Sequence, residues 1–344
     1  FPLFLKSICN LKFDLESNGK KKLKAFFTNS DGKNCIFGSD ISLKLCGIGD
    51  EVEVKQTFLG EGGFSRVFPI KGNDKKIVRV TRGFESKREN GYVLEKLSFK
   101  LLEKLNNADS NDSKHIVRID KYGIYKTIFK MRQYFGLYSL QDKYLGGDLY
   151  DIQKEYQKEI RNYPKFMYKI MMDLAAATAF IHKLNICNRD MKAENVMLAK
   201  KINSLNDVPY IKVIDFGLAT TIEKNGLVSL NNTLRVGTTN FKSPELIKGE
   251  RYGALTDVWS LGIIYYDLYR YNTPFENGFE RDSQIPEISY GTMEHNDFEL
   301  YELLRDNMLV LKESRITSME VFSLMKDIYR KKSIQKYITG YNSM

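Results

Sequence analysis

Asn188-Arg189-Asp190-Met191-Lys192-Ala193-Glu194-Asn195 is the stretch from which the rest of the sequence can be interpreted. Its acids, bases and amides make it too polar for a core strand, and it is too short for a solvated helix. A short apolar run, Ile211-Lys212-Val213-Ile214, leads to another acid at Asp215. Two carboxylates and a nearby amide suit a divalent cation on oxygen ligands, with one carboxylate left for proton transfer. The pattern therefore predicts a functional site.

Length and composition limit the class of protein. With 344 residues, of which 42% are hydrophobic, the chain is long enough for two lobes or for one domain with an extension. The formal charge of +10 comes from Lys and Arg scattered among 43 acids, so we expect a solvated basic surface and no nucleic-acid partner.

The four cysteines show neither metal-ligand spacing nor a disulfide scaffold, which favours a reducing, cytoplasmic location. No apolar run approaches the roughly 18 residues that span a bilayer, so we expect no transmembrane segment.

Residues 1–50 alternate between apolar and polar side chains, as in Leu11 to Leu15 and again around Lys24. Asn18-Gly19 lies between these two runs and is a hairpin signal. We therefore predict a β-rich N-terminal extension that packs on the domain C-terminal to it, because an isolated hairpin is marginal in water.

Glycines at positions 60, 62 and 63 open a glycine-rich segment. Gly60, Gly62 and Gly63 allow a tight strand-turn-strand whose N–H groups approach phosphates, although Ser65 stands where a third glycine is usual. A strand at 77–80 and a helix from 86 to 105 come next in the chain.

Arg79 is flanked as an inward-facing strand cation would be, and Arg82 is the alternative. Such a cation, paired with a helix carboxylate, would neutralise and orient a polyphosphate. Glu95 is the predicted partner, with Glu89 and Glu103 as competitors.

Two apolar strands, near 122–128 and 134–140, lead into residues 141–148, which contain Gly-Gly and open a helix. This pattern predicts a linker between lobes, with a ligand cleft at the junction. Beyond it, 166–181 has one apolar helical face and 257–270 is apolar almost all round, so that helix should be buried. The fold class is therefore α+β, with a small β-rich lobe and a larger helical lobe.

These segments occur in the order of a known family. The glycine-rich loop, the strand cation, the Gly-Gly-Asp-Leu hinge, the loop at 188–195, Asp-Phe-Gly at 215–217, Ser-Pro-Glu at 243–245, Asp-Val-Trp-Ser-Leu-Gly at 257–262 and Arg-Ile-Thr at 315–317 together resemble a eukaryotic protein kinase domain of the serine/threonine branch. The resemblance implies a bilobal fold with an extension at 1–50, an N-lobe at 51–140, a hinge at 141–148, a C-lobe at 149–332 and a tail at 333–344.

The resemblance also implies roles for individual residues. Asp190 would accept the proton of a protein Ser or Thr hydroxyl, and Lys192 would steady the phosphoryl group, with Arg79 and Glu95 as the strand-helix pair. Mg²⁺ would be held by Asn195 and Asp215. The residues that would contact ATP are Gly60, Gly62, Gly63, Val67, Asp142, Tyr144, Asp148, Asn195 and Asp215.

The same resemblance implies three further features. Glu245 and Arg315 match the buried ion pair of the family, and Thr238 matches the threonine that touches the catalytic acid. Arg189 is placed as in kinases whose activation loop is ordered by a phosphate. Thr233 is the first candidate for that phosphosite and Ser229 the second, modified by an activating kinase or by autophosphorylation.

The chain departs from the family pattern at two positions. Arg79 stands where lysine is usual, and its planar guanidinium is larger than an ammonium group, so it could shift the phosphates or fill their place. Asn188 replaces the usual histidine, at a position interpreted as packing rather than proton transfer. An active serine/threonine kinase and a nucleotide-binding pseudokinase, acting as scaffold or allosteric regulator, are therefore both open. The segment from 275 to 299 is interpreted as a long surface loop, with a docking surface as the alternative.

Overall fold

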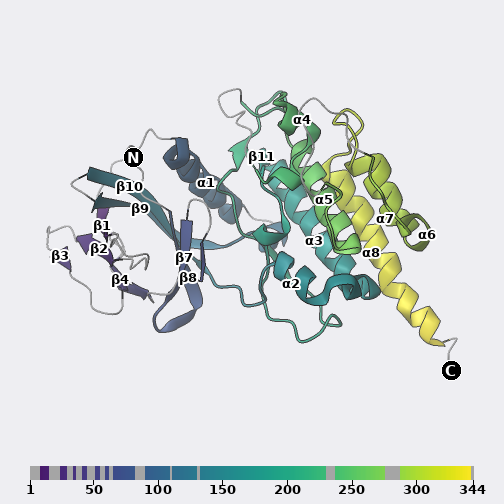
Figure 1. Cartoon of the computed structure of the whole chain (residues 1–344), viewed down its shortest axis with the longest axis horizontal. Coiled ribbons are helices and arrows are strands. Elements are labelled where there is room, and N and C mark those ends of the chain that lie inside the picture. The colour runs from purple at the N-terminus through teal and green to yellow at the C-terminus, as the bar shows by residue number, and fades with distance from the viewer. Residues whose placement is uncertain are drawn as a thin grey trace. The chain divides into compact units, whose positions relative to one another are not determined.

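The computed structural model describes two compact units (Figure 1), one comprising Phe1–Glu103 with Arg118–Lys143 and the other Lys104–Val117 with Tyr144–Met344. The described residues are 8–14, 24–28, 34–35, 41–44, 51–54, 59–61, 65–81, 90–108, 111–129, 132–229, 237–275 and 287–341.

The first unit is built on one sheet, in which ten strands are described in the order β3-β2-β1-β9-β10-β8-β7-β5-β4, with β6 also paired to β7. The strands are β1 (Ile8–Asp14), β2 (Lys24–Thr28), β3 (Asn34–Cys35), β4 (Ile41–Lys44), β5 (Glu51–Val54), β6 (Gly60–Glu61), β7 (Ser65–Ile70), β8 (Asn73–Thr81), β9 (Ile119–Phe129) and β10 (Arg132–Asp142).

The predicted N-terminal hairpin is confirmed by the pairing of its strands. β1 and β2 are antiparallel, with Leu11 opposite Phe27 and Phe13 opposite Ala25. β1 then pairs in parallel with β9, where Ile8 lies opposite Ile124. The hairpin is thus joined to the sheet by main-chain hydrogen bonds, which supply the stabilisation that an isolated hairpin lacks.

The first part of helix α1 (Asn90–Asn107) packs on this sheet. Phe99 is 1% exposed and forms a core cluster with Leu137 of β10. Its ring stacks on Tyr122 of β9 at a centroid distance of 5.3 Å. The predicted helix began at residue 86, and residues 82–89 lie outside the described ranges.

The second unit is helical. Its helices are α2 (Leu149–Tyr156), α3 (Pro164–Lys183), α4 (Pro244–Lys248), α5 (Leu255–Arg270), α6 (Met293–Asn296), α7 (Phe298–Glu302) and α8 (Ser318–Tyr341), with short helices η2 (Asn111–His115), η3 (Gln157–Asn162), η4 (Ala193–Asn195), η6 (Thr239–Phe241) and the π-helix η7 (Leu303–Met308). The predicted burial of residues 257–270 is confirmed, because apolar residues all round α5 are buried. α3 packs against both α5 and α8.

Four short strands complete the second unit and place its loops. β11 (Ile186–Cys187) pairs with β14 (Thr220–Thr221), and β12 (Val196–Leu198) pairs with β13 (Ile211–Val213). Because each pair is antiparallel, segments distant in sequence are brought side by side.

A sheet in one unit and helices in the other confirm the predicted α+β fold. The chain passes between the units after Lys143, within the predicted hinge, and the limits of the five predicted segments stay predictions. Of the predicted loop at 275–299, residues 276–286 lie outside the described ranges, whereas α6 and the start of α7 occupy its end.

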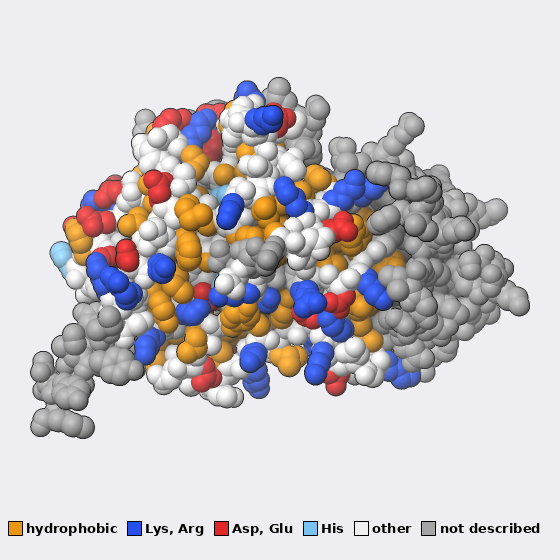
Figure 2. Space-filling view, turned by 180° about the vertical axis from the view of Figure 1, so that it is seen from behind, with side chains coloured by type: hydrophobic (Ala, Val, Ile, Leu, Met, Phe, Trp, Pro, Cys, Tyr) orange, Lys and Arg blue, Asp and Glu red, His pale blue; other side chains and the backbone are white. Residues whose placement is uncertain are grey.

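Charged side chains are mixed on the surface. On the face drawn in Figure 2, Lys and Arg occur in scattered groups with Asp and Glu among them. Among the helices of the described residues, none combines the length and the apolar character needed to cross a bilayer.

Candidate active site

The loop of residues 188–195 lies between β11 and β12 in the second unit. The Asp257 carboxylate on α5 accepts hydrogen bonds from the main-chain N–H groups of Asn188 at 2.7 Å and Arg189 at 2.8 Å. Arg189 has a φ of 68°, a left-handed conformation that is uncommon outside glycine. The bonds to α5 therefore hold a strained turn immediately before Asp190.

Asp190 is surrounded by hydrogen-bond donors. Its Oδ1 accepts from the main-chain N–H of Thr238 at 3.0 Å and from the Thr238 hydroxyl at 2.9 Å. Asn195 Nδ2 donates to Asp190 Oδ2 at 3.1 Å and to its main-chain oxygen at 2.8 Å. Lys192 Nζ lies 3.8 Å from Oδ2 and donates to the Thr238 hydroxyl at 3.0 Å. The carboxylate is therefore held in one orientation.

Burial raises the pKa of Asp190 above the usual carboxyl value, and the charge of Asp215 raises it further. The charge of Lys192 and the hydrogen bonds from Thr238 and Asn195 oppose this rise. A partly desolvated carboxylate that is held in place by hydrogen-bond donors has the character of a general base.

Asp215 follows β13 and is brought beside Asn195 by main-chain pairing. The N–H of Ile214 donates to the main-chain oxygen of Asn195 at 3.0 Å, and Asp215 Oδ1 accepts from the N–H of Gly217 at 2.8 Å. Both side-chain hydrogen bonds of Asn195 to Asp190 use Nδ2, so its amide oxygen is the atom suited to a cation.

An amide oxygen and a carboxylate fit Mg²⁺, which keeps several waters and is commonly shared with substrate phosphates. Within the part of the chain that the structure describes, no three His, Cys, Asp or Glu residues form a metal-binding group. The donor set therefore fits a cation completed by phosphate oxygens better than a closed protein cage.

Tyr144 and Asp148 lie at the start of the second unit. Residues 145 and 146 donate main-chain hydrogen bonds to the oxygens of Ala199 and Leu198, and Lys212 Nζ lies 5.8 Å from the centre of the Tyr144 ring. Asp148 caps α2, because its Oδ1 accepts from the N–H of Asp151 at 2.8 Å. Its carboxylate thus has a structural partner already.

Gly60, Val67 and Arg79 belong to adjacent strands of the first unit. Val67 of β7 lies opposite both Gly60 of β6 and Arg79 of β8, so the strand register places the three positions in one row across the sheet. Arg79 is half-buried, and its guanidinium carbon lies 6.0 Å from the centre of the Phe99 ring of α1. Gly62, Gly63 and the alternative Arg82 lie outside the described residues.

Three carboxylates, those of Glu95, Glu89 and Glu103, were predicted as possible partners of Arg79. Glu95 lies in α1, but its side chain lies outside the described part of the chain, as does all of Glu89. Glu103 is exposed and accepts a hydrogen bond from the Tyr122 hydroxyl at 2.8 Å. The choice between these three carboxylates stays a prediction.

Asp142, at the end of β10, is engaged by a lysine that the sequence interpretation missed. Lys76 of β8 lies directly opposite Asp142, and its Nζ is 2.5 Å from Asp142 Oδ1 and 2.5 Å from Asp120 Oδ2. Burial is the largest single influence on the pKa of Lys76 and lowers it. The hydrogen bonds and charges of the two carboxylates together outweigh burial, so the pKa of Lys76 is raised. The Asp142 carboxylate is therefore paired with a lysine of the same sheet.

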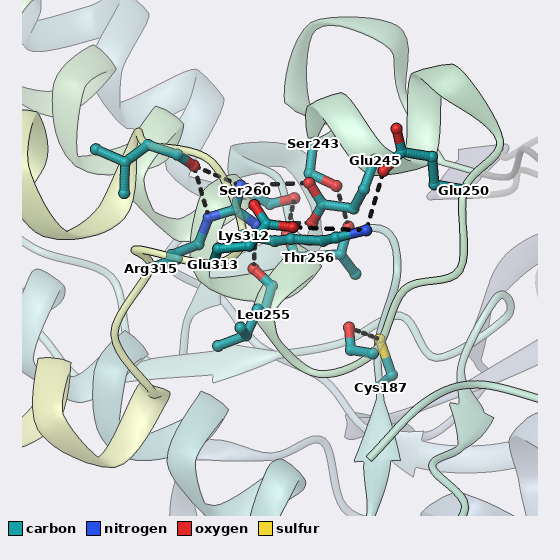
Figure 3. A network of polar contacts seen from close by, with 12 residues as sticks. Cys187, Ser243, Glu245, Glu250, Leu255, Thr256, Ser260, Lys312, Glu313 and Arg315 are labelled. Carbon is teal, nitrogen blue, oxygen red and sulfur yellow. Dashed lines mark hydrogen bonds and ion pairs between the residues drawn. The ribbon is translucent and has the colours of Figure 1, made fainter. Parts of the chain in front are cut away.

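Glu245 and Arg315 form the predicted buried ion pair (Figure 3). Arg315 Nη1 lies 2.7 Å from Glu245 Oε1 and also donates to the main-chain oxygen of Leu255 at 2.9 Å. The guanidinium carbon lies 5.1 Å from the centre of the Trp259 ring. This network fixes the segment after Thr238 to the start of α5 and to the segment before α8.

The predicted activation-loop residues are only partly described. Ser229 is half-buried, and Thr233 lies outside the described residues. Arg189 is 3% exposed; its Nε donates to the main-chain oxygen of Leu218 at 2.6 Å and its Nη1 to the Tyr252 hydroxyl at 3.0 Å. The arginine proposed to bind a phosphate is thus anchored by uncharged oxygens.

Asp257 opens the Asp-Val-Trp-Ser-Leu-Gly motif, but the sequence interpretation gave it no role. It lies in the first turn of an almost wholly apolar helix and is 1% exposed. A buried carboxylate needs donors, and an isolated acid at the start of such a helix is the signal that could have found it.

Comparison with known proteins agrees with this geometry. A model of the protein kinase domain matches residues 54–336. The chain is 33% identical over 193 residues to the dual specificity protein kinase pyk3 of Dictyostelium discoideum. The aligned residues are 54% of this chain and 13% of that protein. It is 27% identical over 294 residues to calcium-dependent protein kinase 5 of Plasmodium berghei, covering 83% of this chain and 45% of the relative.

The serine/threonine-protein kinase Genghis Khan of Drosophila melanogaster is 30% identical over 162 residues, which are 45% of this chain and 9% of that protein. The aligned regions thus span less than half the length of each of these three relatives. The family model, in contrast, extends over most of this chain, from the last residue of β5 into α8. The chain therefore belongs to the protein kinase domain family, as the order of its motifs predicted.

Proposed function

We propose that the protein is a serine/threonine protein kinase that transfers the γ-phosphoryl group of ATP to a hydroxyl of a protein substrate. The observation that carries this proposal is the environment of Asp190, whose carboxylate is fixed by Thr238 and Asn195 and approached by Lys192. Oδ1 accepts two hydrogen bonds from Thr238, whereas Oδ2 accepts one from Asn195, so Oδ2 is the atom proposed to accept the proton.

The residues around Asp190 support this division of roles. Lys192 bridges the Thr238 hydroxyl and the neighbourhood of Asp190 Oδ2, which is where an ammonium group can stabilise a transferring phosphoryl. Asn195 and Asp215 would hold Mg²⁺, which neutralises charge on the nucleotide phosphates. All five of these side chains belong to the second unit, so their mutual geometry is internal to it.

The proposed nucleotide contacts in the hinge are refined by the observed pairing. The Asp142 carboxylate is held by Lys76 and that of Asp148 by the N–H of Asp151. We therefore assign the contribution of Asp142 to its main-chain groups, and the contact of Tyr144 stays a prediction. The contacts of Gly60, Gly62, Gly63, Val67 and Arg79 stay predictions from the family resemblance.

The proposed acceptor is Ser or Thr. Lys192, two residues beyond the acid, resembles the serine/threonine branch, whereas tyrosine kinases usually carry a different loop. The names of the relatives include a serine/threonine kinase and a dual specificity kinase. Phosphoamino-acid analysis of a labelled substrate checks this assignment, and phosphotyrosine as the main product would overturn it.

Activation by phosphorylation at Thr233 or Ser229 is a further part of the proposal. The position of Arg189 next to Asp190, as in kinases whose activation loop is ordered by a phosphate, supports it. Mass spectrometry of the purified protein, with and without ATP, and the activity of Thr233→Ala and Ser229→Ala test it. Loss of activity in neither variant would exclude both sites as the switch.

The proposed location is the reducing interior of the cell, the cytoplasm. Cys187 supports it, because this thiol is buried and forms no disulfide. Fractionation of cells that express the full-length protein tests the location, and recovery with secreted proteins would contradict it.

Phosphate transfer from ATP and Mg²⁺ to a generic basic protein tests the proposed function. We expect transfer by the wild type and a loss of about a hundredfold or more in Asp190→Asn, since positioned acid–base groups contribute about 10²- to 10⁴-fold. Asp327→Asn, which removes an exposed carboxylate from α8, is the matched control. Transfer that survives in Asp190→Asn would reveal a contaminant, and a wild type that binds ATP without transfer would favour a nucleotide-binding pseudokinase.

A further inference from the structure

The side chain of Asn188 contacts the main chain of both acids of the site. Its Oδ1 accepts a hydrogen bond from the N–H of Asp190 at 3.0 Å, and its Nδ2 donates to the main-chain oxygen of Asp215 at 2.9 Å. The residue is 1% exposed, and its own N–H is bound by Asp257. The interpretation of this position as a packing site is therefore incomplete, because both polar atoms of the side chain are used.

The two hydrogen bonds connect segments that are 27 residues apart in sequence. Asp190 lies in the loop after β11, and Asp215 lies in the loop after β13. Another direct link is the bond from the N–H of Ile214 to the oxygen of Asn195. The Asn188 amide is thus a second link between the two segments, and it limits how far the two acids can move apart.

Asparagine is suited to this position for a geometric reason. An Asn oxygen that accepts from the N–H two residues later forms a local turn, and this turn surrounds Arg189 with its φ of 68°. Asn188 is buried and its two partners, Asp190 and Asp215, are half-buried; an unsatisfied buried polar group costs about 1–3 kcal/mol. The amide therefore contributes to the turn and to the contact with Asp215 together.

Histidine cannot make both contacts in the same way. The two atoms bonded to the γ carbon of Asn are an oxygen and a nitrogen, whereas in His they are one nitrogen and one carbon. Nδ1 can replace one of the two bonds, but a carbon then takes the place of the other amide atom, and the second ring nitrogen, Nε2, lies farther from the γ carbon. In asparagine, one planar amide group makes both contacts.

We propose that Asn188 is a positioning residue that fixes the spacing between Asp190, the proposed base, and Asp215, the proposed magnesium ligand. The roles of these two acids rest on the proposed function. Loss of the Asn188 amide would let the Asp215 segment shift against the loop of Asp190, and a misplacement of about 1 Å can lower a rate about a hundredfold.

Asn188→Leu, Asn188→His and Asn188→Asp separate the two hydrogen bonds. Leucine has a similar shape and keeps neither bond, histidine keeps one, and aspartate keeps the acceptor but repels the oxygen of Asp215. Asn106→Leu is the matched control, because Asn106 also donates its amide to a main-chain oxygen, that of Val117, at 3.0 Å in the second unit.

The first measurement is steady-state phosphate transfer. We expect kcat of Asn188→Leu to fall by about 10- to 100-fold, with the KM for the protein substrate little changed, and Asn188→His to be intermediate. Asn106→Leu should lower thermal stability without this fall in kcat. A folded Asn188→Leu protein with wild-type kcat, or an equal loss in the control, would overturn the proposal.

The second measurement needs no turnover. Calorimetry of a non-hydrolysable ATP analogue, with and without Mg²⁺, reports how strongly the cation enhances nucleotide binding. We expect that enhancement to weaken in Asn188→Leu and Asn188→Asp and to persist in Asn106→Leu. If the wild type transfers no phosphate, the proposed function fails, whereas an unchanged Mg²⁺ enhancement in every Asn188 variant overturns the positioning role. If Asn188→Leu does not fold, the histidine and aspartate variants decide by the same criterion.

Discussion

The hydroxyl oxygens of Ser243 and Thr256 lie 2.6 Å apart, and both residues are buried (Figure 3). Ser243 precedes α4, whereas Thr256 is in the first turn of α5, next to the Asp257 that binds the loop before Asp190. The first turn of α5 thus binds both the loop before Asp190, through Asp257, and the segment before α4, through the pair of hydroxyl groups.

We expect Ser243→Ala to lower the free energy of unfolding by about 1–3 kcal/mol, because it leaves the Thr256 hydroxyl buried without this partner. Thr256→Val should cost a similar amount. The double variant should be less destabilised than the sum of the two, since neither polar group then remains unpaired. Urea unfolding of the four proteins measures the coupling, and strictly additive losses would contradict it.

The ion pair of Glu245 and Arg315 gives a larger expected effect. The Arg315 side chain is 0% exposed and that of Glu245 3%, so removing one charge leaves the other buried without its partner. We expect Glu245→Gln to lower the free energy of unfolding by about 3–5 kcal/mol. Lys312→Gln is the control, because its ion pair with Glu250 is partly exposed and should contribute only about 0–1 kcal/mol. Equal losses of unfolding free energy in the two variants would show that burial of the ion pair is not the cause of the destabilisation.

Arg79→Lys tests the strand cation. If Arg79 holds the nucleotide phosphates, a compact ammonium group in place of the planar guanidinium should alter the affinity or rate with ATP, by up to about a hundredfold. Lys75→Arg on the same strand is the control, because Lys75 is exposed. ATP titrations of binding and of phosphate transfer give the answer, and indifference to Arg79→Lys would move the assignment to Arg82.

His115 predicts how stability depends on pH. It is 2% exposed, and burial lowers its pKa from 6.5 to about 4. Asp173 lies 3.6 Å from its Nε2 but is bound by Lys169 at 2.6 Å, which offsets the carboxylate charge. Between pH 6.5 and 4 the unfolded chain binds the proton and the folded chain does not, so stability falls as the pH falls through this range.

The pKa difference corresponds to about 3 kcal/mol once the pH is below both values. We expect His115→Gln to flatten the dependence of stability on pH between 6.5 and 4, and the exposed His295→Gln to leave it unchanged. Denaturant unfolding at pH 7 and pH 5 measures the slopes. The comparison uses slopes because His115→Gln also changes stability at neutral pH.

The sequence by itself determined the kind of fold and the identity of the acids. Period-2 alternation predicted the N-terminal hairpin, and an apolar pattern without a polar face predicted the burial of α5, because these patterns depend on neighbouring residues alone. The order of the motifs predicted the kinase family, which the family match confirms. It also predicted the contact of Thr238 with Asp190, which the structure confirms.

The partners of buried polar groups were decided only by the tertiary structure. Asp257 binds the N–H of Asn188 from 69 residues away, Asn188 joins Asp215 across 27, and Lys76 meets Asp142 across 66. Nothing in local spacing specifies such pairs, because they arise when strands and helices distant in sequence pack together and each buried donor or acceptor must find a partner. The sequence therefore named the acids of the site, and packing decided what holds them in place.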